Sequence, residues 1–169
     1  ALEANGYTLW GRDVGFLSTG IQDDLGRQCA LCPSRERGHG SDHLFKPAKY
    51  VLLTGSSELS PNNAASIDAA RIPKNLYGGE VKVVLGSQVA GEGLDLRYIR
   101  EVIVFDSWYH LNKLEQVIGR GIRNCSHALL DRKFRNCTIA LLVNTYASEP
   151  ETETIDMYSY RMALEKAIQ

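Results

Sequence analysis

The sequence has little of several features that would place it in a specialised class of protein. None of its apolar runs approaches the roughly 18 residues that a membrane-spanning helix needs, so we expect no membrane association. The N-terminus lacks a basic flank followed by an apolar run, so no secretory signal is visible and we expect an intracellular protein. Four cysteines among 169 residues are too few for a disulfide scaffold.

An excess of charge of one sign is also missing. The formal net charge is −1, whereas a protein that holds nucleic acid by bulk electrostatics usually has a basic excess. Any such binding must therefore come from a local patch or from a partner segment. Residues 110–135 are one such patch, with six basic and two acidic residues. The hydrophobic content of 44% and charged content of 23% are typical of a folded domain rather than a disordered chain.

Short apolar runs, each followed by a turn signal, predict the strands. Most are rich in Val and Ile without polar alternation, which is typical of parallel strands covered on both faces. These runs lie at 50–54, 81–85, 102–105 and 138–143. Helical patterns alternate with them, so the sequence predicts an α/β fold with an open, mostly parallel sheet flanked by helices.

Three helices are predicted between and after these strands. A Ser60-Pro61 cap opens a helix through about Arg71, and Asn112 caps a second helix through about Asn124. The third spans residues 153–168, with Ile155, Tyr158 and Met162 on one stripe. We therefore assign residues 49–169 to the α/β domain.

Residues 1–48 form an irregular N-terminal segment, with short strands considered at 7–10 and 16–18. The segment contains Cys29, Cys32, His39 and His43 in the pattern Cys-x₂-Cys-x₆-His-x₃-His. Two thiolates and two imidazoles suit tetrahedral zinc, although the central spacer is shorter than in most zinc fingers. A polar insertion without a core has few other ways to become ordered. A loop with unengaged side chains and a Cys-x-x-Cys redox centre are the alternatives.

The segment from Leu114 to Arg123 carries the clearest chemical signal. On a helix, Gln116, Arg120 and Arg123 lie on one side, opposite the apolar residues Leu114, Val117, Ile118 and Ile122. Paired guanidinium groups suit a polyphosphate, whereas the alternative is a solvated face whose arginines pair with acids. Gly119 and Gly121 each cost a helix about 1 kcal/mol relative to Ala, so we expect a close approach to the backbone there.

These residues fall into an ordered set of motifs. The stretches 87–95 and 116–123, the latter as Gln-x-x-Gly-Arg-x-x-Arg, resemble motifs V and VI of the C-terminal RecA-like domain of superfamily 2 helicases. The run from Tyr50 to Gly55 takes the place of motif IV. More narrowly, residues 92–96, 115–120, 122–127 and 156–161 resemble helicases of large nucleocytoplasmic DNA viruses. That group is related to the poxvirus early transcription factor ATPase and nucleoside triphosphatase I.

The resemblance implies the C-terminal lobe of an ATP-dependent nucleic-acid helicase or translocase. Arg123, as an arginine finger, and Arg120 would reach the phosphates of ATP and Mg²⁺ held by an N-terminal RecA-like lobe in cis, with Gln116 orienting them. Gly93 and Asp95 would lie beside the nucleotide. The implied contacts to DNA or RNA are Ser87, Thr54 and Gly55. Transcription machinery is an expected partner, and the expected location is the cytoplasm or the virion.

Two phosphate-handling motifs do not occur in the sequence. It has no Gly-x-x-x-x-Gly-Lys-Ser/Thr and no Asp-Glu pair after a strand, the parts that hold the phosphates and magnesium in such enzymes. We therefore expect the isolated domain to be inactive toward ATP. The alternative function is a noncatalytic, zinc-stabilised module on an α/β scaffold that binds protein or nucleic acid through its arginine face.

Overall fold

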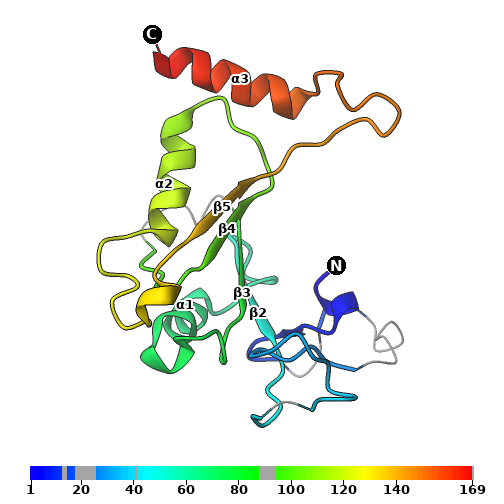
Figure 1. The fold of residues 1–169 in the computed structure, drawn as a ribbon, viewed down its shortest axis with the longest axis vertical. Helices are drawn as coiled ribbons and strands as arrows, with labels where there is room; N and C mark the ends of the chain where they lie inside the picture. The colour runs from blue at the N-terminus through cyan, green and yellow to red at the C-terminus, as the bar shows by residue number, and fades with distance from the viewer. Residues whose placement is uncertain (13–14, 18–25, 41, 88–93, 169) are drawn as a thin grey trace. The chain divides into compact units, whose positions relative to one another are not determined.

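The computed structural model describes residues 1–169 except 13–14, 18–25, 41, 88–93 and 169. The chain divides into two compact units, Ala1–Tyr98 and Ile99–Gln169 (Figure 1). Each unit combines parallel strands with helices, which confirms the predicted α/β class. Among the described residues, no helix has both the length and the apolar character needed to cross a membrane.

The first unit contains a parallel sheet in the order β1-β2-β3, formed by β1 (Thr8–Leu9), β2 (Lys49–Leu53) and β3 (Val83–Gly86). β1 confirms the short strand considered at 7–10. The strand considered at 16–18 is wrong for Phe16 and Leu17, which form a bend, and Ser18 lies outside the described residues. Short 3-10 helices occur in both units: η1 (Glu3–Asn5), η3 (Pro73–Asn75) and η5 (Arg132–Phe134).

The core of this unit forms around the central strand. In β2, Tyr50, Val51 and Leu53 are buried, as expected for a strand covered on both faces. Helix α1 (Asn63–Arg71) contacts β2 and buries Ala69 and Ala70. Small residues allow this close packing, and Trp10, Val84 and Leu96 pack against the resulting cluster.

Helix α1 begins later than predicted. Asn62, not Ser60, is the N-cap, and its Oδ1 atom accepts a hydrogen bond of 3.2 Å from the Ala65 N–H. Ser60 is buried and bonds instead to Thr54, with 2.7 Å between the two hydroxyl oxygens. The predicted cap was therefore wrong because Ser60 closes the preceding turn.

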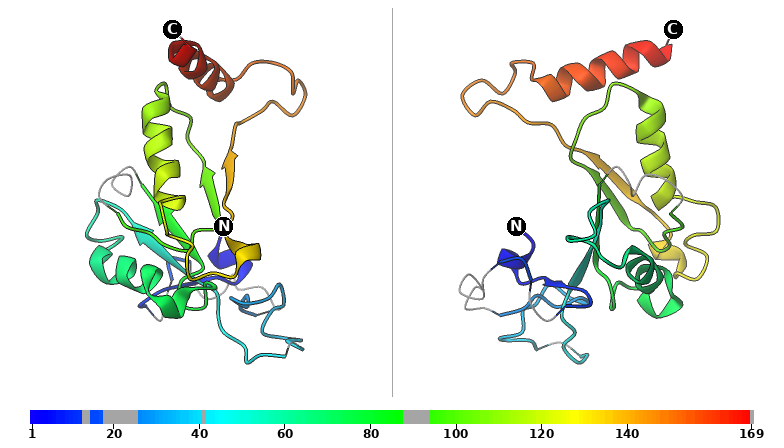
Figure 2. Two further views of the ribbon diagram at one scale, coloured as in Figure 1. Left: turned by 60° about the vertical axis from the view of Figure 1, so that its left-hand side comes forward. Right: turned by 180° about the vertical axis from the view of Figure 1, so that it is seen from behind.

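The second unit pairs β4 (Glu101–Val104) with β5 (Thr138–Leu141) in parallel. Helix α2 (Leu111–Gly121) connects them and lies alongside β4 in each view (Figures 1 and 2). Ile103, Ile139 and Leu141 are at least 40% exposed, so the predicted burial of these strands on both faces is wrong within this unit. The described residues here supply too few covering elements for two strands.

Helices α2 and α3 (Ile155–Ile168) also depart from the predicted patterns. α2 follows the extended backbone of His110 and ends at Gly121, so Asn112 lies inside its first turn rather than at its cap. α3 buries Ser159 and Ala163, whereas Ile155 is 75% exposed. The predicted apolar stripe is therefore wrong, because the small residues are the buried ones on this helix.

Candidate functional site

Three of the predicted contact residues meet at one edge of the first sheet. Thr54 and Gly55 follow β2, and Ser87 follows β3. The Ser87 N–H donates a hydrogen bond of 3.0 Å to the Leu53 carbonyl, which joins the two strand ends. Gly55 and Ser87 are exposed, whereas the Thr54 hydroxyl lies within the Ser60 turn. The carboxyl edge of a parallel sheet is where α/β proteins bind ligands.

The next predicted site residues, Gly93 and Asp95, follow β3 in the sequence. Gly93 lies outside the described residues. The Asp95 carboxylate accepts a hydrogen bond of 3.4 Å from the Arg97 guanidinium in a half-exposed ion pair. Such a surface pair contributes little to stability.

Helix α2 carries part of the predicted arginine face. Gln116 and Arg120 lie one turn apart on the helix, at i and i+4, with Gln116 exposed and Arg120 half-buried. Ile122 is the C-cap, so the exposed Arg123 lies just beyond the helix. The predicted continuous face over Gln116, Arg120 and Arg123 is therefore wrong at its last position. The same early end leaves Ile122 51% exposed instead of packed.

Gly121, the last residue of α2, lies in the tightest packing of the helix. This glycine is buried, and a Cβ placed on it would lie 2.6 Å from Cγ2 of Val102 and 3.4 Å from Cγ2 of Ile99. The close approach predicted at Gly121 is therefore confirmed, and β4 is its source. At Gly119 the same prediction is wrong within the described structure: a Cβ there would meet nothing within 4 Å beyond its own helix.

This contrast predicts opposite effects of one methyl group. Gly121→Ala is expected to destabilise the fold by about 1–3 kcal/mol because Val102 cannot yield without repacking. Gly119→Ala, the matched control, is expected to stabilise it by up to about 1 kcal/mol through helix propensity. Urea unfolding of both variants measures the difference. Equal effects would contradict the packing described for Gly121.

Asp156 begins one of the helicase-like stretches, and its carboxylate, for which the sequence predicted no role, organises the start of α3. Asp156 accepts hydrogen bonds from the Asn144 backbone N–H at 2.9 Å, the Asn144 side-chain amide at 2.7 Å and the Ser107 hydroxyl at 3.0 Å. Ser107 follows β4 and Asn144 follows β5, so Asp156 joins three elements of the unit. The sequence signal that could have indicated this role is the position of Asp156, an acid in the first turn of a predicted helix.

The Asp156 contacts predict a pH-dependent stability. The Asn144 backbone hydrogen bond, followed by those of the Asn144 and Ser107 side chains, lowers the pKa of Asp156. A lowered folded pKa stabilises the protein above the ordinary Asp value of about 3.9, and this stabilisation is lost as pH falls through the folded pKa. Asp156→Asn should lower the unfolding temperature at pH 7 and much less near pH 3. Glu151→Gln, at an exposed acid of the same unit, should change neither value.

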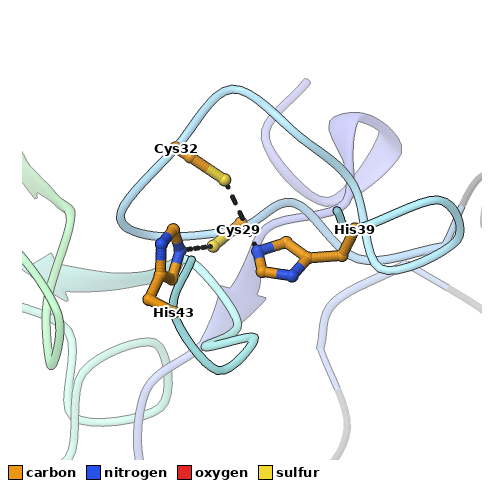
Figure 3. Close-up of side chains that lie close together, drawn as sticks. All are labelled: Cys29, Cys32, His39 and His43. Carbon is orange, nitrogen blue, oxygen red and sulfur yellow. Dashed lines mark hydrogen bonds between the residues drawn. The ribbon is translucent and has the colours of Figure 1, made fainter. Parts of the chain in front are cut away.

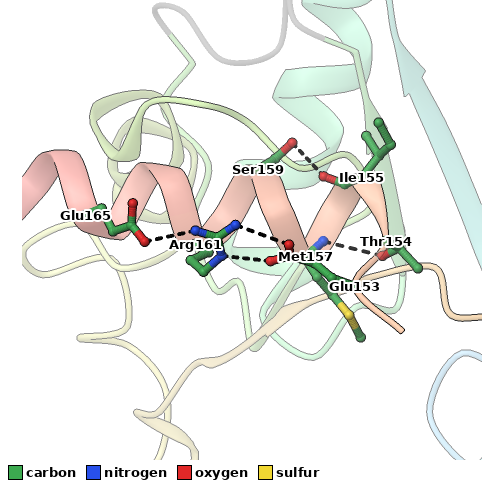
Figure 4. A network of polar contacts seen from close by, with 7 residues as sticks. All are labelled: Glu153, Thr154, Ile155, Met157, Ser159, Arg161 and Glu165. Atoms are coloured by element: carbon green, nitrogen blue, oxygen red, sulfur yellow. Dashed lines mark hydrogen bonds and ion pairs between the residues drawn. The ribbon is translucent and has the colours of Figure 1, made fainter. Parts of the chain in front are cut away.

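Helix α3 also carries a charged network on its surface (Figure 4). The Arg161 guanidinium donates to both oxygens of Glu153, at 2.7 and 3.1 Å, and to Glu165 at 3.0 Å. Thr154 caps the helix by accepting from the Met157 N–H. The hydrogen bonds to Glu153 raise the pKa of Arg161. Arg161 therefore bonds within α3 and to Glu153 just before it, although residues 156–161 resemble a stretch of the viral helicases.

The predicted Cys/His set lies together in the first unit. The metal-ligating atoms of Cys29, Cys32, His39 and His43 all lie within 4.8 Å of one another. Cys29 Sγ is 3.4 Å from His43 Nε2, and Cys32 Sγ is 3.5 Å from His39 Nε2 (Figure 3). These four side chains could hold a metal ion.

The environment of Cys29 favours its thiolate. Burial opposes ionisation of Cys29, but hydrogen bonds from the backbone of Lys46, from His43 and from the backbone of Leu31 and Cys32 outweigh it. The pKa of Cys29 is thereby lowered to about 5. The hydrogen bond to Cys29 raises the pKa of His43 in turn. The pair thus favours the ionised sulfur that metals bind.

Comparison with known sequences assigns most of this chain to one family. Residues 31–125 match the family described as "Helicase conserved C-terminal domain". A "Putative ATP-dependent RNA helicase" of Acanthamoeba polyphaga mimivirus is 38% identical over 113 residues, covering 59% of this chain and 10% of the relative. An "Early transcription factor large subunit homolog" of African swine fever virus (isolate Pig/Kenya/KEN-50/1950) is 33% identical over 121 residues, covering 70% and 10%.

A third relative extends the match to another group of viruses. A "Putative helicase" of Invertebrate iridescent virus 3 is 29% identical over 133 residues, covering 76% of this chain and 14% of the relative. The chain therefore spans only about a tenth of the length of these relatives. The matches confirm the resemblance to superfamily 2 helicases, and to those of large DNA viruses in particular, that the sequence motifs indicated.

Proposed function

The chain belongs to the helicase conserved C-terminal domain family, and we propose that it is the C-terminal lobe of an ATP-dependent helicase or translocase. In this proposal the lobe works with an N-terminal RecA-like lobe in cis and moves on DNA or RNA. Residues 49–169 form the lobe and residues 1–48 a segment joined to it. The observation that carries the proposal is the Gln-x-x-Gly-Arg-x-x-Arg sequence at the end of α2, within the family match.

The proposed role of this sequence is to complete an ATP site on the other lobe. Arg123 acts as the arginine finger, and its place beyond the helix end suits a side chain that reaches outward to a phosphate. Arg120 supports the same phosphates from the last helical turn. Gln116, one turn earlier, orients the guanidinium groups through its amide.

Mg²⁺ accompanies ATP in such enzymes and offsets the phosphate charge. The residues just described offer guanidinium and amide donors, which suit phosphate oxygens rather than a cation. We therefore assign the magnesium ligands to the N-terminal lobe. Gly93 and Asp95 are proposed to lie beside the nucleotide, the latter as an acceptor for a ribose hydroxyl.

The nucleic-acid track is proposed to cross the carboxyl edge of β2 and β3. There the exposed Gly55 can offer its backbone N–H and the exposed Ser87 its hydroxyl to a phosphate, with Thr54 supporting the turn. The names of the African swine fever virus relatives favour transcription as the setting. The location that we propose for it is the cytoplasm or the virion.

ATP hydrolysis by this chain with and without its partner lobe tests the proposal. The 169-residue chain alone is expected to hydrolyse ATP at least 10³-fold more slowly than a protein that joins it to the N-terminal lobe. Addition of single-stranded DNA or RNA is expected to stimulate only the joined protein. Helicase-like turnover by the chain alone would overturn this division of labour.

The Cys/His set favours the second candidate, a noncatalytic interaction module stabilised by zinc. That candidate needs no ATP chemistry, so it predicts that the arginines can be replaced without any loss of turnover by the joined protein. The variants discussed below separate the two functions.

A further inference from the structure

We propose that Cys29, Cys32, His39 and His43 form a structural zinc site that fixes residues 26–48 against the start of β2. This site is independent of the helicase function proposed above. Two thiolates and two neutral imidazoles make up a ligand set that zinc binds in structural centres. All four residues come from one short segment, so the metal closes a local loop.

The distances between the side chains fit a tetrahedral zinc ion. With Zn–S near 2.3 Å and Zn–N near 2.0–2.1 Å, the sulfur-to-nitrogen edge of the tetrahedron is about 3.5 Å. The two measured pairs, Cys29 to His43 and Cys32 to His39, are 3.4 and 3.5 Å apart. The remaining separations lie within 4.8 Å, so side-chain shifts on the order of 1 Å bring all four ligands to one ion.

The backbone around the cysteines is already arranged for a metal. The Cys29 N–H donates to the Ser34 carbonyl at 3.0 Å, which folds the chain back after Cys32. The Gln28 side chain stabilises the same turn, because its amide donates to the carbonyls of Cys29, Cys32 and Ser34. The turn therefore presents both sulfurs on one side.

Neighbouring groups support the ligands. The His39 ring lies edge-on to His43, with centroids 4.9 Å apart, and to Phe45 at 5.5 Å. Cys29 is only 2% exposed, and four protein ligands leave a tetrahedral ion no open position. The site is therefore structural rather than catalytic.

The site connects to the sheet through short backbone hydrogen bonds. The Ala30 N–H donates to the Lys46 carbonyl at 2.8 Å, and the Ala48 N–H donates to the Gln28 carbonyl at 2.7 Å. The Ala48 carbonyl in turn accepts from the Thr8 N–H of β1 at 3.0 Å. Zinc at this place therefore holds the entry to the central strand.

A redox pair is the competing use of Cys29 and Cys32. Reactive cysteine pairs gain from the N-terminus of a helix, whereas Cys29 lies in a β-bridge and Cys32 in a bend. Each sulfur also lies beside a histidine, which a disulfide does not require. A Cys29–Cys32 disulfide is thus an outcome that the experiment must detect.

The experiment measures metal in the 169-residue chain purified without chelators from zinc-supplemented cells. We expect about one zinc ion per chain by mass spectrometry of the metal content. Replacement by Co²⁺ should give the visible absorption of a tetrahedral ion together with a thiolate-to-cobalt charge-transfer band. Cys29→Ser and His43→Asn should lower affinity for Co²⁺ at least tenfold, whereas the controls Cys125→Ser and His110→Asn should not.

The zinc content and the Co²⁺ spectrum of the wild-type chain keep the test decisive even if a ligand variant fails to fold. Less than about 0.3 zinc per chain without the cobalt charge-transfer band overturns the proposal. Zinc retained equally by Cys29→Ser and by the control variants also overturns it, because the metal would then be adventitious. A Cys29–Cys32 disulfide found by mass spectrometry in freshly purified protein overturns it in favour of redox chemistry.

Discussion

Arg123→Ala is expected to lower ATP hydrolysis by about 10³- to 10⁵-fold in a protein that joins this chain to its N-terminal lobe. The physical reason is that a guanidinium stabilises charge on the phosphoryl group only during transfer, so its loss affects turnover far more than ATP binding. Steady-state hydrolysis and nucleotide affinity should both be measured. Arg120→Ala should reduce turnover in the same direction, and Gln116→Ala should do so to a smaller extent.

The matched control for Arg123→Ala is Arg132→Ala, which removes one exposed arginine from η5 of the same unit. It changes the net charge equally and should leave turnover unchanged. Thermal unfolding of both variants should match the wild type, since both side chains lie at the surface. Unchanged hydrolysis in Arg123→Ala would reject the finger and favour the noncatalytic interaction module.

Removal of zinc is expected to expose residues 26–48 to protease while the second unit stays protected. The described part of this segment buries only Cys29, Ala30 and Ala48 among its apolar side chains, too few to form a core. Zinc in structural sites contributes an apparent binding free energy of roughly 10–16 kcal/mol, so its loss should dominate local stability. Trypsin should then cleave after Arg35 and Arg37 at least about tenfold faster.

The internal control for this proteolysis is the basic pair Arg132 and Lys133, which lies in the second unit. Cleavage there should not respond to the chelator, and added zinc should restore protection of the first unit. Cleavage products identified by mass spectrometry distinguish the two regions. Equal acceleration at all sites would mean that the chelator acts on the whole chain, and no acceleration would mean that the metal does not order the segment.

The sequence predicted those features that depend on neighbouring residues along the chain. The strands lie within two residues of their predicted starts because apolar runs and turn signals are local. The Cys/His set could also be predicted, because Cys29 and Cys32 are close in sequence and their spacing is typical of metal ligands. The fold class followed from the alternation of these local elements.

Features that depend on distant residues could not be predicted. Gly119 and Gly121 look equivalent in sequence, and only the position of Val102 makes one of them tightly packed. Asp156 holds Ser107 and Asn144, whose proximity requires the folded strands. The end of α2 at Gly121, before Arg123, likewise could not be read from the sequence. The contacts at Gly121 and Asp156 form only once the strands have folded, so no local pattern of residues predicts them.

The parallel pairing of β1 with β2 has a consequence for the order of folding. Thr8 pairs with Lys49, so this contact closes a loop of about forty residues before it contributes any hydrogen bond. Such closure costs entropy, and we expect β1 to join late, onto an already formed β2-β3 pair. Bridging of the Cys/His loop by a metal would shorten the chain left to search. Zinc bound at the Cys/His set would then speed the joining of β1 to β2.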